Sequence, residues 1–156
     1  MIKRVASLSQ LNQQNFIDLG CSHALLLIDI DNTLLSPYDQ RISSQEIQWI
    51  KNAQVDHQIL LCTNNFTKRQ SNVGVDLNLP ILMRSFKPFP FKVRSYLKRQ
   101  KADLNSVVII GDQAVTDVLL ALWLGRPYLL IKPMDVDKHW ITRFFRILES
   151  KVIHDE

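Results

Sequence analysis

The sequence predicts an α/β fold in which a central parallel sheet is covered by helices on both faces. Short apolar runs alternate along the chain with segments whose apolar residues recur at helical spacing, which is the pattern of strand–helix–strand crossovers. The apolar runs are continuous, as expected of parallel strands that are buried on both faces. Polar and acidic residues directly follow several of these runs, where ligands bind in open parallel sheets.

Five short apolar runs are predicted to be strands. Four of them have a length and composition typical of a buried strand, whereas the remaining one is weaker because Pro80 interrupts it. The four are Ala24–Ile30, Gln58–Cys62, Val107–Ile110 and Pro127–Ile131, and the weaker one is Leu79–Met83.

Helices are expected between and after these strands, because the apolar residues there recur every three or four positions. Ser43 or Ser44 can cap the first helix, Pro90 can open another, and Gly125 can end a third. The expected helices are one containing Ile47, Trp49, Ile50 and Ala53, one beginning near Phe66, one from Pro90 to about Gln100, Val115–Leu124 and Trp140–Lys151.

Length and composition favour one globular domain, residues 1–156. The chain is 46% hydrophobic and 22% charged, which is too apolar for a disordered protein. Its net charge of +4 favours an anionic partner, and by itself leaves open phosphorylated metabolites, nucleic acid and anionic membranes. Two cysteines without metal-binding spacing fit a reducing cytoplasm. We expect neither a signal peptide nor a membrane-spanning segment.

The sequence Asp29-Ile30-Asp31-Asn32-Thr33 closes the first apolar run. Carboxylates in this position need a cation or hydrogen bonds, because an unsatisfied charge against an apolar strand is costly. Asp29 could be a nucleophile that attacks phosphorus, with Asp31 as its acid and base partner. Asp31 and Asn32 could instead form an ordinary turn, and Thr33 could be a turn or cap hydroxyl.

Polar residues also follow the second strand and the weak third one. The Thr63 hydroxyl and the backbone N–H groups from Asn64 onward could hold phosphoryl oxygens. The same two residues could instead form the N-cap of the next helix. Lys87 could neutralise the charge of a phosphoryl group, or could be an ordinary solvated lysine.

The fourth strand is followed by Gly111 and two acidic residues, Asp112 and Asp117. Gly111 allows close approach of the backbone. Asp112 could bind a divalent cation opposite Asp29, or could be a helix N-cap, and Asp117 could orient Lys87 or a metal-bound water. Mg²⁺ prefers oxygen ligands and keeps several of its waters, so two or three protein ligands suffice.

These four segments occur in a diagnostic order. DxDxT at residues 29–33, Thr63-Asn64, Lys87-Pro88 and GDxxxTD at residues 111–117 resemble the four motifs of the haloacid dehalogenase (HAD) phosphatase superfamily. The likeness is strongest to its small subfamily IIIA proteins of the YqeG type, which are similar to the mitochondrial phosphatidylglycerophosphate phosphatase. One departure is the bulky apolar stretch Val118–Trp123, including Leu120–Trp123, where the subfamily usually has small residues and an Asn.

The resemblance implies a HAD-like Rossmannoid α/β/α domain and a Mg²⁺-dependent phosphatase. Such an enzyme hydrolyses a phosphate monoester through an aspartyl-phosphate intermediate. The implied catalytic residues are Asp29 as nucleophile, Asp31 as acid and base, Thr63 and Lys87. The implied phosphate-binding residues are Thr63, Asn64 and Lys87, the metal ligands are Asp29, Asp31 through its backbone carbonyl and Asp112, and the supporting residues are Thr33 and Asp117.

No large cap domain is expected over this site. Only 29 residues separate Thr33 from Thr63, and only 23 separate Thr63 from Lys87, whereas cap domains of the superfamily are inserted in these two intervals. An uncapped site suits a bulky, macromolecular or membrane-bound substrate. The resemblance implies a phosphorylated substrate such as phosphatidylglycerophosphate or another lipid phosphate, and no nucleic-acid partner.

Two other classes of protein remain open at this point. One is a catalytically weak HAD-fold protein with a binding or scaffolding role, although none of the four main catalytic residues is missing. The other is a receiver-type signalling domain, which carries its phosphoacceptor Asp after the third strand. The present chain has Lys87 at that position, so the order of motifs fits a receiver poorly.

The C-terminal segment carries aromatic and basic residues at helical spacing, including Trp140, Arg143, Phe144 and Arg146. Such a helix either packs its aromatic face on the core or lies on a membrane surface. We therefore expect a cytoplasmic protein and keep peripheral contact with the inner face of the membrane as an alternative.

Overall fold

A single six-stranded parallel sheet forms the centre of the computed structural model, which describes residues 2–113 and 115–134. Across the sheet the strands follow the order β1-β6-β5-β2-β3-β4, and every pair of neighbours is parallel. The predicted parallel sheet is therefore confirmed. The strands are β1 (Ile2–Val5), β2 (Leu25–Ile28), β3 (Gln58–Cys62), β4 (Ile81–Leu82), β5 (Val107–Gly111) and β6 (Tyr128–Ile131).

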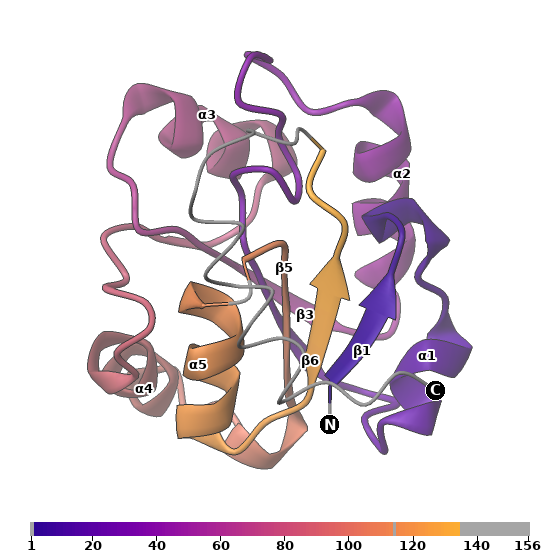
Figure 1. The fold of residues 1–156 in the computed structure, drawn as a ribbon, viewed down its shortest axis with the longest axis vertical. Coiled ribbons are helices and arrows are strands. Elements are labelled where there is room, and N and C mark those ends of the chain that lie inside the picture. Colours follow the sequence, from indigo (N-terminus) through magenta and orange to yellow (C-terminus); the bar gives the residue numbers. More distant parts are fainter. Residues whose placement is uncertain (1, 114, 135–156) are drawn as a thin grey trace.

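Helices cover both faces of this sheet. In Figure 1, α4 and α5 lie on one side of the strands, and α1 and α2 lie on the other. The helices are α1 (Gln13–Asp18), α2 (Ser44–Ala53), α3 (Lys68–Leu77), α4 (Phe91–Arg99) and α5 (Thr116–Leu124), with short 3₁₀ turns η1 (Leu8–Gln10) and η2 (Leu104–Ser106).

The two faces of the sheet belong to separate apolar cores. Successive side chains of a strand point to opposite faces, and β2 shows the consequence. Leu26 and Ile28 pack in the core with α1, α2 and α3, whereas Leu27 packs in the core with α4 and α5. The three layers predicted from the continuous apolar runs are thus present.

Local sequence signals explain where several helices begin and end. The Ser43 side chain accepts a hydrogen bond from the Glu46 N–H and caps α2, as predicted. Pro90 is the N-cap of α4, and Gly125 ends α5 in the left-handed conformation that glycine adopts without strain. The predicted ends of these helices differ from the observed ends by no more than three residues.

Two of the alternative assignments are wrong. The helix expected near Phe66 begins at Lys68 with Thr67 as its N-cap, so Thr63-Asn64 does not cap it. Asp112 is not a helix N-cap either, because the N-cap of α5 is Val115. In both cases a loop of several residues separates the strand end from the helix, and that loop leaves the polar side chains at the sheet edge.

One strand and one α-helix of the described residues were not predicted. β1 is an edge strand with the sequence IKRV. Because two of its four residues are charged, it does not form an apolar run. The short helix α1 buries only Phe16 among its own residues, so it has no apolar period to detect. Its signal is local, since Asn12 and Asn15 form a reciprocal capping box.

The predicted helix Trp140–Lys151, with Arg143 and Arg146, lies outside the described residues. Within residues 2–113 and 115–134, no helix is both long enough and apolar enough to cross a membrane.

The indole of Trp49 gives a test of how α2 is attached to the fold. Its Nε1 donates to the Leu11 carbonyl at 2.8 Å in a buried position. Trp49→Phe leaves that carbonyl without its donor, so we expect the free energy of unfolding to fall by about 1–3 kcal/mol. Urea unfolding followed by circular dichroism measures this loss. Trp123→Phe, at a side chain that is 63% exposed, is the control, and an equal loss in both variants would contradict the assignment.

Candidate functional site

The order of the strands creates a topological switch point at the carboxyl end of β2. The chain passes from β2 to β3 and β4 on one side, and then crosses to β5 and β6 on the other. Ligands of open parallel sheets bind where the chain direction reverses in this way. Asp29 is the first residue after β2, and its N–H donates to the Ile110 carbonyl of β5 at 2.9 Å, which holds the residue at the switch point.

Lys87 lies between two buried carboxylates. Its Nζ is 2.5 Å from Asp29 Oδ1 and 2.6 Å from Asp117 Oδ1, and it also donates to the Cys62 carbonyl at 3.2 Å. The side chain of Lys87 is only 3% exposed, so it is not the solvated surface lysine considered above. The loop after β4, the end of β2 and the start of α5 meet at this ammonium group.

Asp112 completes a cluster of three carboxylates. One carboxylate oxygen each from Asp29, Asp112 and Asp117 lies within 4.8 Å of the others. Two further oxygens, Oδ2 of Asp29 and Oδ2 of Asp117, are buried and have no hydrogen-bond partner. When all groups are ionised, three carboxylates face one ammonium, so a divalent cation would restore the charge balance. Oxygen ligands of this kind fit Mg²⁺.

The pKa values of the cluster reflect this excess of negative charge. Burial raises the pKa of Asp29 well above its usual range, and the charges of Asp117 and Asp112 raise it further while Lys87 opposes them. Burial and the Asp117 charge raise the pKa of Asp112 to about 7. Burial alone would lower the pKa of Lys87, but Asp117 and Asp29 hold it well above its ordinary value, so Lys87 is charged.

Gly111 makes room for the Asp117 carboxylate. A Cβ atom at Gly111 would lie 2.5 Å from Asp117 Oδ2, which is closer than a non-bonded contact permits. The close approach expected at this glycine is therefore between its backbone and the carboxylate that contacts Lys87. On the other side of the cluster, the Thr33 hydroxyl is completely buried and donates to Asp112 Oδ1 at 3.5 Å.

Asn64 holds the lysine loop instead of offering its side chain to a ligand. Its Oδ1 accepts from the Lys87 N–H at 2.7 Å and from the Ser85 hydroxyl at 2.8 Å, and its Nδ2 donates to the Lys87 carbonyl at 2.8 Å. The side chain of Asn64 therefore positions Lys87. The predicted phosphate-binding role could be served only by its backbone N–H.

Asp31 is held by four donors from the loop after β3 and the first turn of α3. Oδ2 accepts from Asn65 Nδ2 at 2.8 Å and from the Thr63 hydroxyl at 3.3 Å. Oδ1 accepts from Gln70 Nε2 at 2.9 Å and from Arg69 at 3.2 Å. The side chain of Asp31 is not part of the carboxylate cluster around Lys87.

Comparison with known proteins identifies the family of this chain. Residues 3–133 match the family model of the mitochondrial PGP phosphatase, which spans all of the site described above. The chain belongs to this family. It is therefore a HAD-type phosphatase, a hydrolase that acts on phosphate esters.

A curated relative agrees with the assignment to the PGP phosphatase family, and two solved structures share the fold. The probable phosphatase YqeG of Bacillus subtilis is 25% identical over 130 residues, covering 82% of this chain and 75% of that protein. The hypothetical protein XCC2798 from Xanthomonas campestris has a TM-score of 0.60 at 21% identity over 80% of this chain and 73% of its own. An uncharacterised protein from Listeria monocytogenes serotype 4b has a TM-score of 0.54 at 13% identity over 83% and 99%. The two structures support the fold alone.

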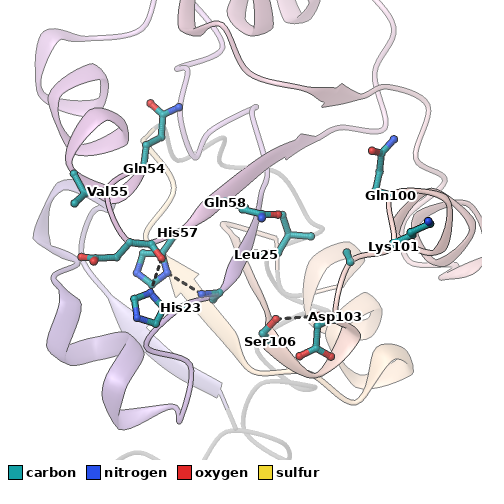
Figure 2. A pocket seen from close by; sticks show the side chains of 13 residues that line it. His23, Leu25, Gln54, Val55, His57, Gln58, Gln100, Lys101, Asp103 and Ser106 are labelled. Carbon is teal, nitrogen blue, oxygen red and sulfur yellow. Dashed lines mark hydrogen bonds between the residues drawn. The ribbon is translucent and has the colours of Figure 1, made fainter.

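A hollow of about 420 Å³ lies elsewhere on this family member, away from the carboxylate cluster. Figure 2 shows that its lining includes His23, Leu25, His57, Gln58 and Ser106. Leu25 and Gln58 are the first residues of β2 and β3, so the hollow lies at the amino ends of the strands. The carboxylates lie at the opposite, carboxyl ends.

Sequence reasoning missed the residues that hold Asp31, namely Asn65, Arg69 and Gln70. Gln70 is the clearest case, because its side chain is 2% exposed although glutamine usually faces solvent. Thr67, the N-cap of α3, also donates its hydroxyl to Gln70 Oε1. The position of Arg69 and Gln70 in the sequence could have indicated this role. They lie in the first turn of the helix that follows the Thr63 loop, and such a turn lies at the same edge of the sheet as the loop.

Gln70 tests whether the position of Asp31 matters for turnover. Gln70→Leu removes a buried hydrogen bond to a charged acceptor, so we expect kcat for a phosphate ester to fall about tenfold and its pH profile to shift. Gln48→Leu, on the exposed side of α2, is the matched control. Thermal unfolding of both variants separates lost activity from lost folding. Equal kcat values and pH profiles in the two variants would show that Gln70 does not position a reacting group.

Proposed function

We propose that this chain is a Mg²⁺-dependent phosphatase that cleaves a phosphate monoester of a bulky substrate through an aspartyl phosphate on Asp29. The observation that carries the proposal is the environment of Asp29 at the end of β2. One of its oxygens contacts Lys87, and the other is buried without a partner beside two more carboxylates. Desolvation makes a carboxylate more reactive, and the adjacent Lys87 ammonium opposes the rise in the pKa of Asp29 that burial causes.

In the first step a carboxylate oxygen of Asp29 attacks phosphorus and forms the aspartyl phosphate. The bond between phosphorus and the ester oxygen breaks, and Asp31 gives its proton to the leaving oxygen. In the second step water attacks the same phosphorus and Asp31 takes up its proton. The bond to Asp29 then breaks, which releases inorganic phosphate and regenerates the free carboxylate.

The contacts of Asp31 indicate how it could change its protonation state. A protonated carboxyl must direct its own O–H at an acceptor, so at least one of the four donors on Asp31 has to turn away. The Thr63 hydroxyl can do so by rotation alone, because it already accepts a hydrogen bond from the Asn65 N–H at 3.0 Å. We assign two roles to Thr63. Its hydroxyl turns away from Asp31 when Asp31 is protonated, and it contacts the phosphoryl group.

The Mg²⁺ ion would be held by Asp29 and Asp112, with the Asp31 carbonyl as a further ligand and Asp117 close by. It would supply positive charge to the phosphoryl oxygens. Lys87 supplies a second, fixed positive charge and holds Asp29 and Asp117 in place. The three carboxylates support this assignment because a single ammonium cannot balance them.

A bulky substrate is supported by the short intervals between the motifs. The segment between Thr33 and Thr63 forms α2 and β3, and the segment between Thr63 and Lys87 forms α3 and β4. Neither segment therefore contains a cap domain. The matching family model is named for a phosphatase of the lipid phosphatidylglycerophosphate, and we propose a lipid phosphate as the substrate class. Phosphate release from a panel of soluble and lipid phosphate esters tests this choice.

The nucleophile is tested by two substitutions with opposite effects on the intermediate. Asp29→Asn should abolish turnover, because an amide cannot form the acyl phosphate. Asp31→Asn should lower kcat by roughly 10²–10⁴-fold and leave labelled phosphate covalently attached to the protein. Mass spectrometry of the acid-quenched enzyme detects that adduct. Turnover by Asp29→Asn at the rate of the wild type would refute the mechanism.

The cation is tested by thermal unfolding as well as by activity. EDTA should stop turnover and Mg²⁺ should restore it, while Mg²⁺ at about 100 times its dissociation constant should stabilise the folded protein by about 2.7 kcal/mol. Asp112→Asn should lose most of this stabilisation, yet should be no less stable than the wild type in EDTA because one repelling charge is gone. Asp56→Asn, exposed at the amino ends of the strands, is the control. A Mg²⁺ shift that is unchanged in Asp112→Asn would remove Asp112 from the metal site.

A further inference from the structure

Four phenylalanine side chains are exposed on the loops that form the site. Their exposed fractions are 59% for Phe66, 63% for Phe86, 58% for Phe89 and 77% for Phe91. Phe66 lies in the loop after β3, which also carries Thr63, and the others lie between β4 and the first residue of α4, around Lys87. Exposed aromatic residues gathered in one region mark an interaction surface.

Contacts between the two loops bring Phe66 and Phe86 to one region of the surface, and the Phe89 N–H donates to the Phe86 carbonyl at 2.9 Å. The Arg84 guanidinium lies over the Phe66 ring at 4.2 Å, and the Arg84 N–H donates to the Asn65 carbonyl at 3.3 Å. Lys92 lies over the Phe86 ring at 5.2 Å and donates to the Arg84 carbonyl at 2.6 Å. We call Phe66, Arg84, Phe86, Phe89, Phe91 and Lys92 the aromatic–basic patch.

The chain around this patch is strongly basic. Residues 63–102 contain nine of the 19 Lys and Arg residues of the protein, but only one of its 15 acidic residues, Asp76. The remaining residues contain ten basic and fourteen acidic side chains. The positive net charge of the chain is therefore confined to this segment. Two of its basic residues, Arg84 and Lys92, lie over rings of the patch and make it complementary to an anionic surface. Lys87 is buried in the site, and Lys101 lies at the amino ends of the strands.

We infer that the aromatic–basic patch docks the enzyme on an anionic lipid bilayer. Phenylalanine has no hydrogen-bonding group, so its ring enters the boundary between headgroups and acyl chains without losing polar contacts. Arginine and lysine beside the rings attract the negative headgroups. The patch surrounds Lys87 in the chain, so docking places the carboxylate cluster at the membrane surface. The consequence for catalysis rests on the proposed function, whereas the binding does not.

Vesicle flotation with the full-length chain tests the docking directly. The probes are vesicles of phosphatidylcholine alone and vesicles of equal parts phosphatidylcholine and phosphatidylglycerol, at low and high salt. We expect binding to the anionic vesicles that weakens as salt screens the charges, and little binding to phosphatidylcholine alone. Failure of the wild type to float with anionic vesicles at low salt would overturn the inference.

Substitution of the aromatic residues separates insertion from simple charge attraction. Phe86→Ser with Phe89→Ser and Phe91→Ser should weaken partitioning to anionic vesicles at least about tenfold. Trp123→Ser, at an exposed aromatic residue near the end of α5, should leave it unchanged. Phe91→Ser alone serves if the triple variant does not fold, and should show a smaller loss. A folded Phe variant that binds anionic vesicles as tightly as the wild type would overturn the inference. A Phe variant that loses self-association but keeps vesicle binding would overturn it as well.

The charge component is tested by reversing two basic residues of the patch. Arg84→Glu with Lys92→Glu should weaken binding by more than about fivefold for each residue. Lys51→Glu with Lys101→Glu changes the net charge equally, but these residues lie toward the amino ends of the strands, where Lys101 lines the hollow of Figure 2. The control pair should bind much more tightly than the patch pair. Equal losses in the two pairs would show that net charge alone drives binding.

Activity distinguishes this inference from the proposed function. The aromatic variants should retain the turnover of the wild type on the soluble ester p-nitrophenyl phosphate, and should lose turnover on a lipid phosphate embedded in anionic vesicles. A wild type that binds vesicles but hydrolyses neither ester would refute the proposed function and leave docking intact. A wild type that hydrolyses the soluble ester but does not bind vesicles would refute docking alone.

Discussion

The buried ammonium of Lys87 is the contact on which the arrangement of the site depends. It lies between Asp29 and Asp117, which belong to the first and the last of the four motifs. Asp29 directly follows β2, and Asp117 lies in the first turn of α5. Removing one partner of a buried ion pair leaves an uncompensated charge and typically costs about 3–5 kcal/mol. The surrounding structure is shaped to keep this contact, since Asn64 fixes the backbone of Lys87 and Gly111 makes room for Asp117.

The contacts of Lys87 leave an excess of negative charge in the site. Lys87 balances only part of the negative charge of Asp29, Asp112 and Asp117, and two buried carboxylate oxygens have no partner. A folded protein tolerates such a cluster where a ligand supplies the missing charge, because an unsatisfied buried charge is otherwise too costly. The three carboxylates are therefore a group that could hold a cation.

The loops that form the site also form the surface around it. Lys87 is held below the surface by Asn64, while its neighbours Phe86 and Phe89 are exposed to solvent. In this short loop one side chain lies in the carboxylate cluster, and the adjacent ones face solvent. If the aromatic residues dock on a membrane as proposed, that membrane also helps to enclose the cluster, because no cap domain covers it.

Sequence alone determined the fold class and the residues at the carboxyl edge, because both depend on short-range patterns. The continuous apolar runs specified buried parallel strands, and in such a sheet the residues that follow each strand must meet at one edge. It could not specify β1 or α1, whose residues carry no apolar period, nor the use of the Asn64 side chain. Only the tertiary structure decided that Gln70, Arg69 and Asn65 hold Asp31 and that Asp117 contacts Lys87 where Gly111 lacks a side chain. It also decided that Arg84 and Lys92 lie over the rings of Phe66 and Phe86. These contacts join residues distant in sequence, so they depend on how helices and loops pack rather than on the local pattern of any one segment.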